Sequence, residues 1–198
     1  MTVRPIVITG DPVLHRRAVP VEEITEQVRT LVADMVETNR AAHGAGLAAP
    51  QVGVGLRVFV WAMGNDDGVP PEGHIINPFV RASKAPEGHP DPDEESEGCL
   101  SVPGEHFPLR RGERAAVSGI DVDGNPVEFV ATGWFARCMQ HEYDHLNGFL
   151  YLDRLEESWG RKARKVVKRH GWGLPGGSWM PGVDPDPFGH DDEDERDL

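Results

Sequence analysis

The chain reads HEYDH at residues 141–145, and the spacing of its two histidines is the most informative feature of the sequence. Two histidines four residues apart lie on one face of a helix, one turn from each other. His141 and His145 can therefore hold one metal ion between their imidazoles. Glu142 can stand over the open coordination position of that ion and shuttle a proton.

The helical face around this stretch has two interpretations. Trp134, Cys138, His141 and His145 share the face, which on the first interpretation is a core stripe with two buried polar histidines. In that stripe two imidazoles, a glutamate and an aspartate within one short segment would each need hydrogen-bond partners. Burying these groups without partners has a considerable cost in free energy. A metal ion accounts for these groups together, so we favour the metal site. Cys138 is then expected in the core, and Asp144 in a structural bond.

A catalytic metal site needs a third protein ligand, and several residues are candidates. The metzincin pattern HExxHxxGxxH is matched at Gly148 but ends on Tyr151, which cannot simply replace a neutral imidazole. Other metalloproteases use a glutamate from a later helix, for which Glu156 and Glu157 are the candidates. Upstream, EGCLS at 97–101 offers Cys99, although a lone cysteine is more commonly a small buried side chain.

Hydrophobic periodicity and turn residues predict a mixture of helices and strands. Asp123-Gly124 marks a tight turn between two strand-like runs and predicts a hairpin. Thr132 is a candidate helix cap, and Gly148 follows the expected end of the same helix. The expected helices cover about 22–42, 132–146 and 156–170, and the expected strands 57–61, 74–80, 114–121, 127–130 and a short strand that carries Cys99.

Length and charge restrict the class of protein. The chain of 198 residues is long enough for one domain with a sizeable core. Its formal net charge of -13 argues against general DNA or RNA binding by the whole molecule. No stretch approaches 18 apolar residues, as a membrane span requires, and the start MTVRPIVITGD lacks the apolar region of a secretory signal. We therefore expect a cytoplasmic protein whose two cysteines stay reduced.

Three segments together resemble the three motifs of bacterial peptide deformylases. They are GAGLAAPQ at 44–51, EGCLS at 97–101 and QHEYDHLNG at 140–148, in the order and at spacings similar to those of the family. The resemblance implies that Cys99, His141 and His145 bind one divalent metal ion, with water in the fourth position. This donor set suits Fe(II), Zn(II), Co(II) or Ni(II), and the family is usually ferrous in cells.

The resemblance also implies a reaction, the release of formate from N-formylmethionyl nascent peptides. Glu142 would take a proton from the metal-bound water and later pass it to the departing amine. The Gln51 side-chain amide and the Leu100 backbone N–H would stabilise the oxyanion, and Gly46 would contact the substrate through its backbone. His106 stands where many relatives have an arginine near the substrate.

The expected fold is a single α+β domain in which antiparallel sheets wrap around the metal-binding helix, with further helices towards both ends. Residues 1–171 form the expected catalytic domain, and 172–198 a Gly/Pro-rich and then acidic tail that is partly disordered. Truncation after Gly171 is expected to leave hydrolysis of a short formyl peptide nearly unchanged. The basic helix 161–170 could dock on the ribosome, and the acidic run 191–197 would oppose that docking.

Two rival functions remain on the residues alone. The first is a zinc peptidase that cuts internal amide bonds, which Tyr151 at the third-ligand position and the EGCLS segment both disfavour. The second is a silent relative that only binds nascent chains or ribosomes, which the presence of Glu142 and Gln51 disfavours. Glu97 either orients a neighbouring loop or metal ligand or is a solvated acid.

Overall fold

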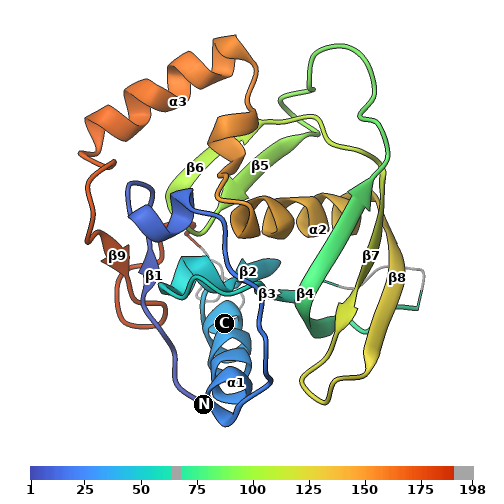
Figure 1. Ribbon diagram of the computed structural model, residues 1–198. Helices are drawn as coiled ribbons and strands as arrows, with labels where there is room; N and C mark the ends of the chain where they lie inside the picture. Colours follow the sequence, from blue (N-terminus) through green and yellow to red (C-terminus); the bar gives the residue numbers. More distant parts are fainter. Residues whose placement is uncertain (64–67, 190–198) are drawn as a thin grey trace, which may run out of the picture.

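Helix α2 (Gly133–Leu146), which carries the HEYDH stretch, lies at the centre of the molecule with sheets around it (Figure 1). The structure is a computed structural model that describes residues 1–63 and 68–189. Its helices and antiparallel sheets form the expected α+β fold. Thr132 occupies the cap position of α2 as expected, but its side chain makes no capping hydrogen bond.

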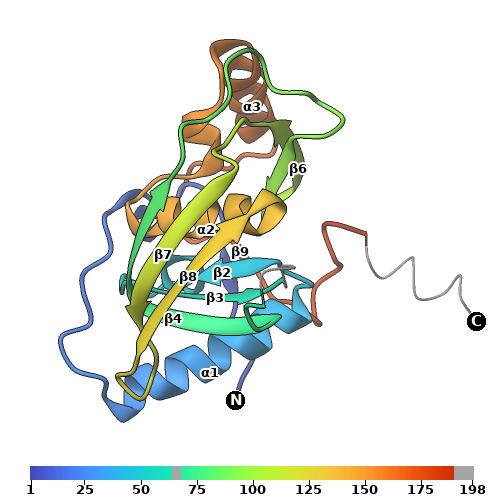
Figure 2. The same cartoon turned by 90° about the vertical axis from the view of Figure 1, so that its right-hand side faces the viewer.

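The largest sheet has five antiparallel strands in the order β2-β3-β4-β7-β8 and packs against one side of α2 (Figures 1 and 2). The predicted hairpin is confirmed as β7–β8, and its turn is closed by Asp121, whose Oδ1 accepts the N–H groups of Asp123 and Asn125 at 2.8 Å each. The strands are β2 (Gly46–Ala48), β3 (Val58–Ala62), β4 (Glu72–Ala82), β7 (Arg114–Ile120) and β8 (Pro126–Thr132).

A second, two-stranded sheet lies beside α2 and carries the EGCLS segment (Figure 1). It consists of β5 (Ser96–Cys99) and β6 (Val102–Pro108). Gly98 pairs with His106, and the register shifts between Gly98 and Cys99. The expected short strand at Cys99 is thus confirmed, and its irregular end turns the chain at the cysteine.

The two other long helices lie outside this centre. Helix α1 (Glu26–Ala41) begins later than the expected residue 22, because the Thr25 hydroxyl accepts the Val28 N–H and caps the helix there. Helix α3 (Glu157–Arg169) lies on the outside of the molecule, against β6 and the short helix that precedes it (Figure 1). Among the described residues, short 3₁₀ helices connect these elements: η1 (Pro12–His15), η2 (Ala49–Val52) and η3 (Tyr151–Arg154).

Part of the segment expected to be a partly disordered tail pairs with the rest of the fold. Strand β9 (Ser178–Trp179) pairs antiparallel with β1 (Ile6–Val7), close to the start of the chain. Trp179 is only 9% exposed and packs into the main hydrophobic core. Burial of this large side chain offsets the entropy of ordering a Gly/Pro-rich segment. The expected acidic run at 191–197 lies outside the described residues.

Within the described parts of the chain, no helix has both the length and the apolar character needed to cross a bilayer.

Candidate metal centre and active site

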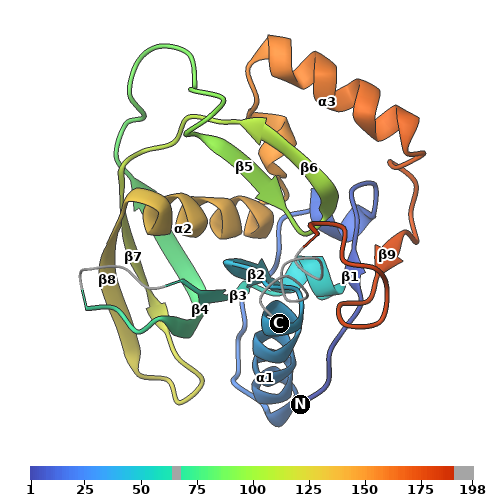
Figure 3. The same cartoon turned by 180° about the vertical axis from the view of Figure 1, so that it is seen from behind.

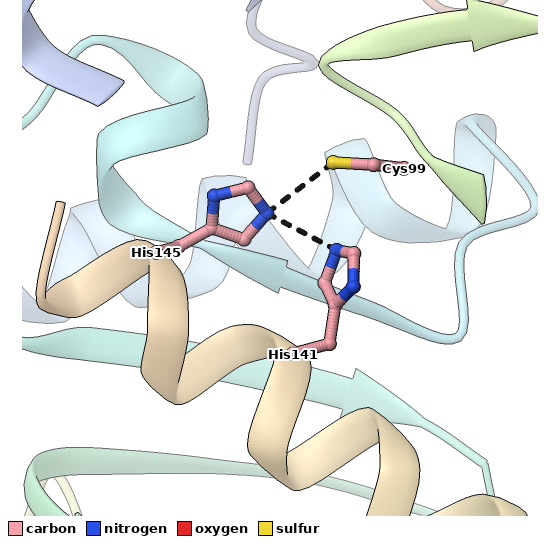
Figure 4. A group of neighbouring side chains, drawn as sticks. All are labelled: Cys99, His141 and His145. Atoms are coloured by element: carbon pink, nitrogen blue, oxygen red, sulfur yellow. Dashed lines mark hydrogen bonds between the residues drawn. The ribbon is translucent and has the colours of Figure 1, made fainter. Parts of the chain in front are cut away.

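Three buried side chains converge where α2 meets the end of β5 (Figure 4). Cys99 Sγ lies 3.3 Å from His145 Nε2, and His145 Nε2 lies 3.2 Å from His141 Nε2. The donor atoms of all three side chains lie within 4.8 Å of one another. Both cysteines are free, so the Cys99 sulfur is available as a ligand. A thiolate and two imidazoles are a donor set that suits a borderline divalent metal.

The other candidates for a third ligand are committed to different contacts. The buried Tyr151 hydroxyl donates to the Glu105 carbonyl at 2.8 Å, and burial raises the pKa of Tyr151 well above its usual range. The Glu156 carboxylate lies 2.8 Å from the ring of His89 on the surface. Glu157 is exposed and pairs with two arginines of its own helix. Only Cys99, of the candidates considered, adjoins the two histidines.

Electrostatic conditions at the two histidine donors also fit a cation. Burial lowers the pKa of His145 well below its usual value, so this side chain is the neutral imidazole that a metal ligand must be. Burial has the same tendency at His141, but the neighbouring Cys99 and Glu97 outweigh it and raise the pKa of His141 well above its usual value. A site that stabilises added positive charge in this way favours a metal cation.

Glu97 contacts the candidate metal centre through His141 and is 4% exposed. Its Oε1 is 2.7 Å from His141 Nδ1, and Arg111 donates to both carboxylate oxygens at 2.7 and 2.8 Å. Arg137 adds a hydrogen bond at 3.0 Å. Burial alone would raise the pKa of Glu97, but the bonds and charge of Arg111 hold it well below its usual range. Of the two interpretations of Glu97, these contacts favour the one in which its carboxylate orients His141, and they disfavour a solvated acid.

Arg111 connects this group to Asp144 on α2. Arg111 Nη1 donates to Asp144 Oδ2 at 2.9 Å, and Arg154 donates to Oδ1 at 2.8 Å. Asp144 therefore has the structural bonds expected of it. The sequence analysis missed Arg111 and Arg137, and the signal that could have found them is physical: a buried glutamate beside a metal ligand requires buried positive partners.

Glu142, on the same helix as the two histidines, lines a pocket together with Cys99 and His141. The residue is 3% exposed, and its Oε2 has no hydrogen-bond partner among the described residues. Burial raises the pKa of Glu142 to about 7. A Cβ atom on Gly46 would lie 2.6 Å from Glu142 Oε1 and 2.9 Å from Cys138 Sγ, so only glycine allows the β2 backbone to come this close.

Gln51 is oriented by the backbone of its own turn. Its Oε1 accepts the Ala48 N–H at 2.8 Å, which directs Nε2 to the other side. Nε2 lies 3.7 Å from Cys99 Sγ and 3.4 Å from Ser101 Oγ. The amide N–H groups are therefore held beside the metal site, where the sequence analysis expected an oxyanion donor.

A pocket of about 310 Å³ opens over this centre. It brings together six of the seven residues expected at the site, whereas His145 lies beneath the pocket as part of the metal group. His106 also lines the pocket, as does Phe188 from the segment after Gly171. Phe188 was missed because the composition around it is typical of a solvated tail. The expected residues in the lining are Gly46, Gln51, Cys99, Leu100, His141 and Glu142.

Comparisons with known proteins match most of this chain. The family model described as polypeptide deformylase matches residues 3–159. A peptide deformylase of Mycolicibacterium paratuberculosis strain K-10 is 53% identical over 96% of this chain and 100% of that protein. A peptide deformylase of Rhodococcus opacus strain B4 is 52% identical over 97% of this chain and 100% of that protein.

Solved structures of the same family share the fold. The peptide deformylase of Ehrlichia chaffeensis in complex with actinonin matches with a TM-score of 0.73 and 39% identity, over 85% of this chain and 98% of that chain. The enzyme of Legionella pneumophila matches with a TM-score of 0.72 and 36% identity, over 85% of this chain and 95% of that chain. The chain therefore belongs to the polypeptide deformylase family, hydrolases that remove the N-formyl group from nascent peptides.

Proposed function

We propose that this chain releases formate from N-formylmethionyl peptides with one divalent metal ion held by Cys99, His141 and His145. The observation that carries the proposal is the convergence of the three donors beneath a pocket lined by Glu142. Fe(II) is the ion proposed in cells, and Zn(II), Ni(II) and Co(II) suit the same donors. Such an ion supplies Lewis-acid polarisation of the formyl group and makes water more acidic.

Glu142 is the proposed proton carrier. Its Oε2 is buried without a partner among the described residues, so it is free to accept a proton from water inside the pocket. The same oxygen then returns the proton to the departing amine nitrogen, whose release as a neutral amine requires it. A residue in hydrogen-bond reach of both atoms can do this without a second acid.

Gln51 and Leu100 are the proposed donors to the oxygen that becomes negative as the formyl carbon turns tetrahedral. The Gln51 amide is already fixed by Ala48, so little reorganisation is needed when the charge develops. Gly46 lines the same pocket as Glu142, and its backbone is the proposed contact to the substrate.

The test uses one peptide in three forms, N-formylated, N-acetylated and unblocked, with metal content measured on the same sample. We expect formate from the formylated peptide alone, loss of activity on removal of the metal, and its return when the metal is restored. Actinonin, which is bound in the Ehrlichia structure, is expected to inhibit. Cleavage of internal amide bonds would instead indicate a zinc peptidase. Peptide binding without formate release would indicate a relative that has no catalytic activity.

We further propose that this protein acts in the cytoplasm and meets its substrate at the ribosome through the basic helix 161–170. All six of its Lys and Arg side chains are exposed. Lys165 and Lys168 make no salt bridge with any described residue, so they are available for phosphates. Reversing both charges should weaken co-sedimentation with ribosomes at low salt. Reversing the exposed Arg16 and Arg17 is the matched control, and equal effects would reject a docking role for the helix.

A further inference from the structure

The segment 178–189 returns to the active site after α3, beyond the part of the chain that the family model matches. It is anchored at its start by the pairing of β9 with β1. The Trp179 indole N–H also donates to the Leu100 carbonyl at 2.9 Å. Leu100 follows the proposed ligand Cys99, so the anchor lies one residue from the metal centre.

The chain after this anchor is held in a defined path by its own polar groups. The Met180 N–H donates to Asp184 Oδ2 at 2.7 Å, and the Asp184 N–H returns a bond to the Met180 carbonyl at 2.9 Å. The Phe188 N–H donates to Asp186 Oδ1 at 2.9 Å. Prolines at 181, 185 and 187 further restrict the backbone. These bonds and prolines hold the loop in the conformation that places Phe188 in the lining of the pocket.

Figure 3 shows this loop, in red, near the start of β6, and the close approach is to Gly104 of that strand. A Cβ atom on Gly104 would lie 2.8 Å from the Pro187 carbonyl oxygen, and Gly104 has a φ of +72°. The next residue, Phe188, meets the His106 ring edge to face, with ring centroids 6.0 Å apart, and the Trp179 ring at 6.2 Å. Phe188 and His106 therefore form one aromatic wall of the pocket.

The pairing of β5 with β6 shows how close this aromatic wall is to the proposed metal ligand Cys99. His106 pairs with Gly98, and a Cβ atom on Gly98 would lie 2.5 Å from the His106 ring. In the proposed reaction the formyl group lies beside Glu142 and the metal donors. His106 and Phe188 line the same pocket but are not among these groups, so a substrate group that contacts them is a different part of the peptide.

We propose that His106 and Phe188 form a binding surface for an apolar or aromatic side chain of a peptide residue that follows formylmethionine. This inference rests on the proposed function and adds to it a specificity-determining segment, 178–189, beyond the residues that the family model matches. It also reverses the expectation that truncation after Gly171 leaves hydrolysis unchanged, because such a truncation removes Phe188 from the pocket.

The test compares kcat/KM for formyl-Met-Phe-Phe and formyl-Met-Ser-Ser. Wild type should prefer the aromatic peptide, and Phe188→Ala should reduce that preference about three- to tenfold, the scale of a lost aromatic contact. Phe188→Tyr should restore most of it. Val183→Ala is the control on the same loop, since Val183 is 79% exposed and does not line the pocket.

His106→Ala distinguishes the loss of a binding surface from a defect in folding. It removes the second ring of the aromatic wall, but the contact between Phe188 and Trp179, which holds the loop, remains. Thermal midpoints and metal contents are measured for every variant. An unchanged preference in both Phe188→Ala and His106→Ala, with a wild type that deformylates both peptides, would overturn the inference. A wild type that releases formate from neither peptide would instead refute the proposed function.

Discussion

Glu97→Gln is the substitution that tests most directly whether Glu97 orients the proposed metal ligand His141. The Glu97 carboxylate lies 2.7 Å from His141 Nδ1 and accepts hydrogen bonds from Arg111 at 2.7 and 2.8 Å and from Arg137 at 3.0 Å. Glutamine keeps the size of the side chain but removes its charge. Arg111 then retains only Asp144 as an anionic partner.

Two separate losses follow from this change. A group that orients a metal-binding histidine contributes about 10- to 100-fold to metal affinity, which is roughly 1.4–2.8 kcal/mol. Removing one partner of a buried ion pair costs about 3–5 kcal/mol in the free energy of unfolding. We expect the lower end, about 3 kcal/mol, because Asp144 still pairs with Arg111. For a domain of this size that lowers the Tm by roughly 6–12 °C.

The assay combines thermal unfolding of the metal-free protein with Zn(II) competition against a chromophoric chelator. Glu95→Gln is the matched control: the Glu95 side chain is 18% exposed, against 5% for Glu97, and its main partner is Arg110. The control should retain metal affinity and lose less stability. Equal metal affinities in the two variants would show that Glu97 does not orient His141, and an unchanged Tm would show that the buried pair contributes little to stability.

Three further substitutions test individual groups. Glu142→Gln should lower kcat at least about 100-fold with metal content and fold preserved, because only the proton-accepting group is altered; near-normal formate release by the metal-loaded variant would contradict this. Cys99→Ser should lose metal on dialysis against a mild chelator while Cys138→Ser keeps it, since a hydroxyl is a far weaker ligand than a thiolate; equal metal contents would exclude Cys99. Trp179→Phe should lower kcat about two- to tenfold through loss of the bond to Leu100, the value of one hydrogen bond; steady-state kinetics with a normal kcat would show that Leu100 holds its position without it.

Local spacing made the helices and the paired histidines predictable. The hydrophobic period predicts a helix over 132–146, and α2 covers Gly133–Leu146. A helix also brings residues four positions apart onto one face, so His141 and His145 had to adjoin if the helix formed. The boundary of α1 was less accurate, because one capping bond at Thr25 decided it.

For the rest of the site, the sequence indicated which residues take part but not where they lie in space. The residues of EGCLS and GAGLAAPQ could be named because they resemble motifs of a known family, but no local rule brings them to α2. Cys99 is 46 positions away from His145 along the chain, and their 3.3 Å contact depends on the packing of β5 and β6 beside the helix. The charge pattern likewise gave no sign that Arg111 and Arg137 would surround Glu97.

The sequence by itself determined the elements that follow from short-range periodicity, the metal-ligand chemistry of HEYDH, and the family. Only the tertiary structure brought Cys99, rather than Tyr151 or a later glutamate, next to the histidines and placed Phe188 in the lining of the pocket. The physical reason is the range of the interactions. A helix is set by neighbours within a few residues, whereas burial of Trp179 and the pairing of β9 with β1 depend on segments from opposite ends of the chain.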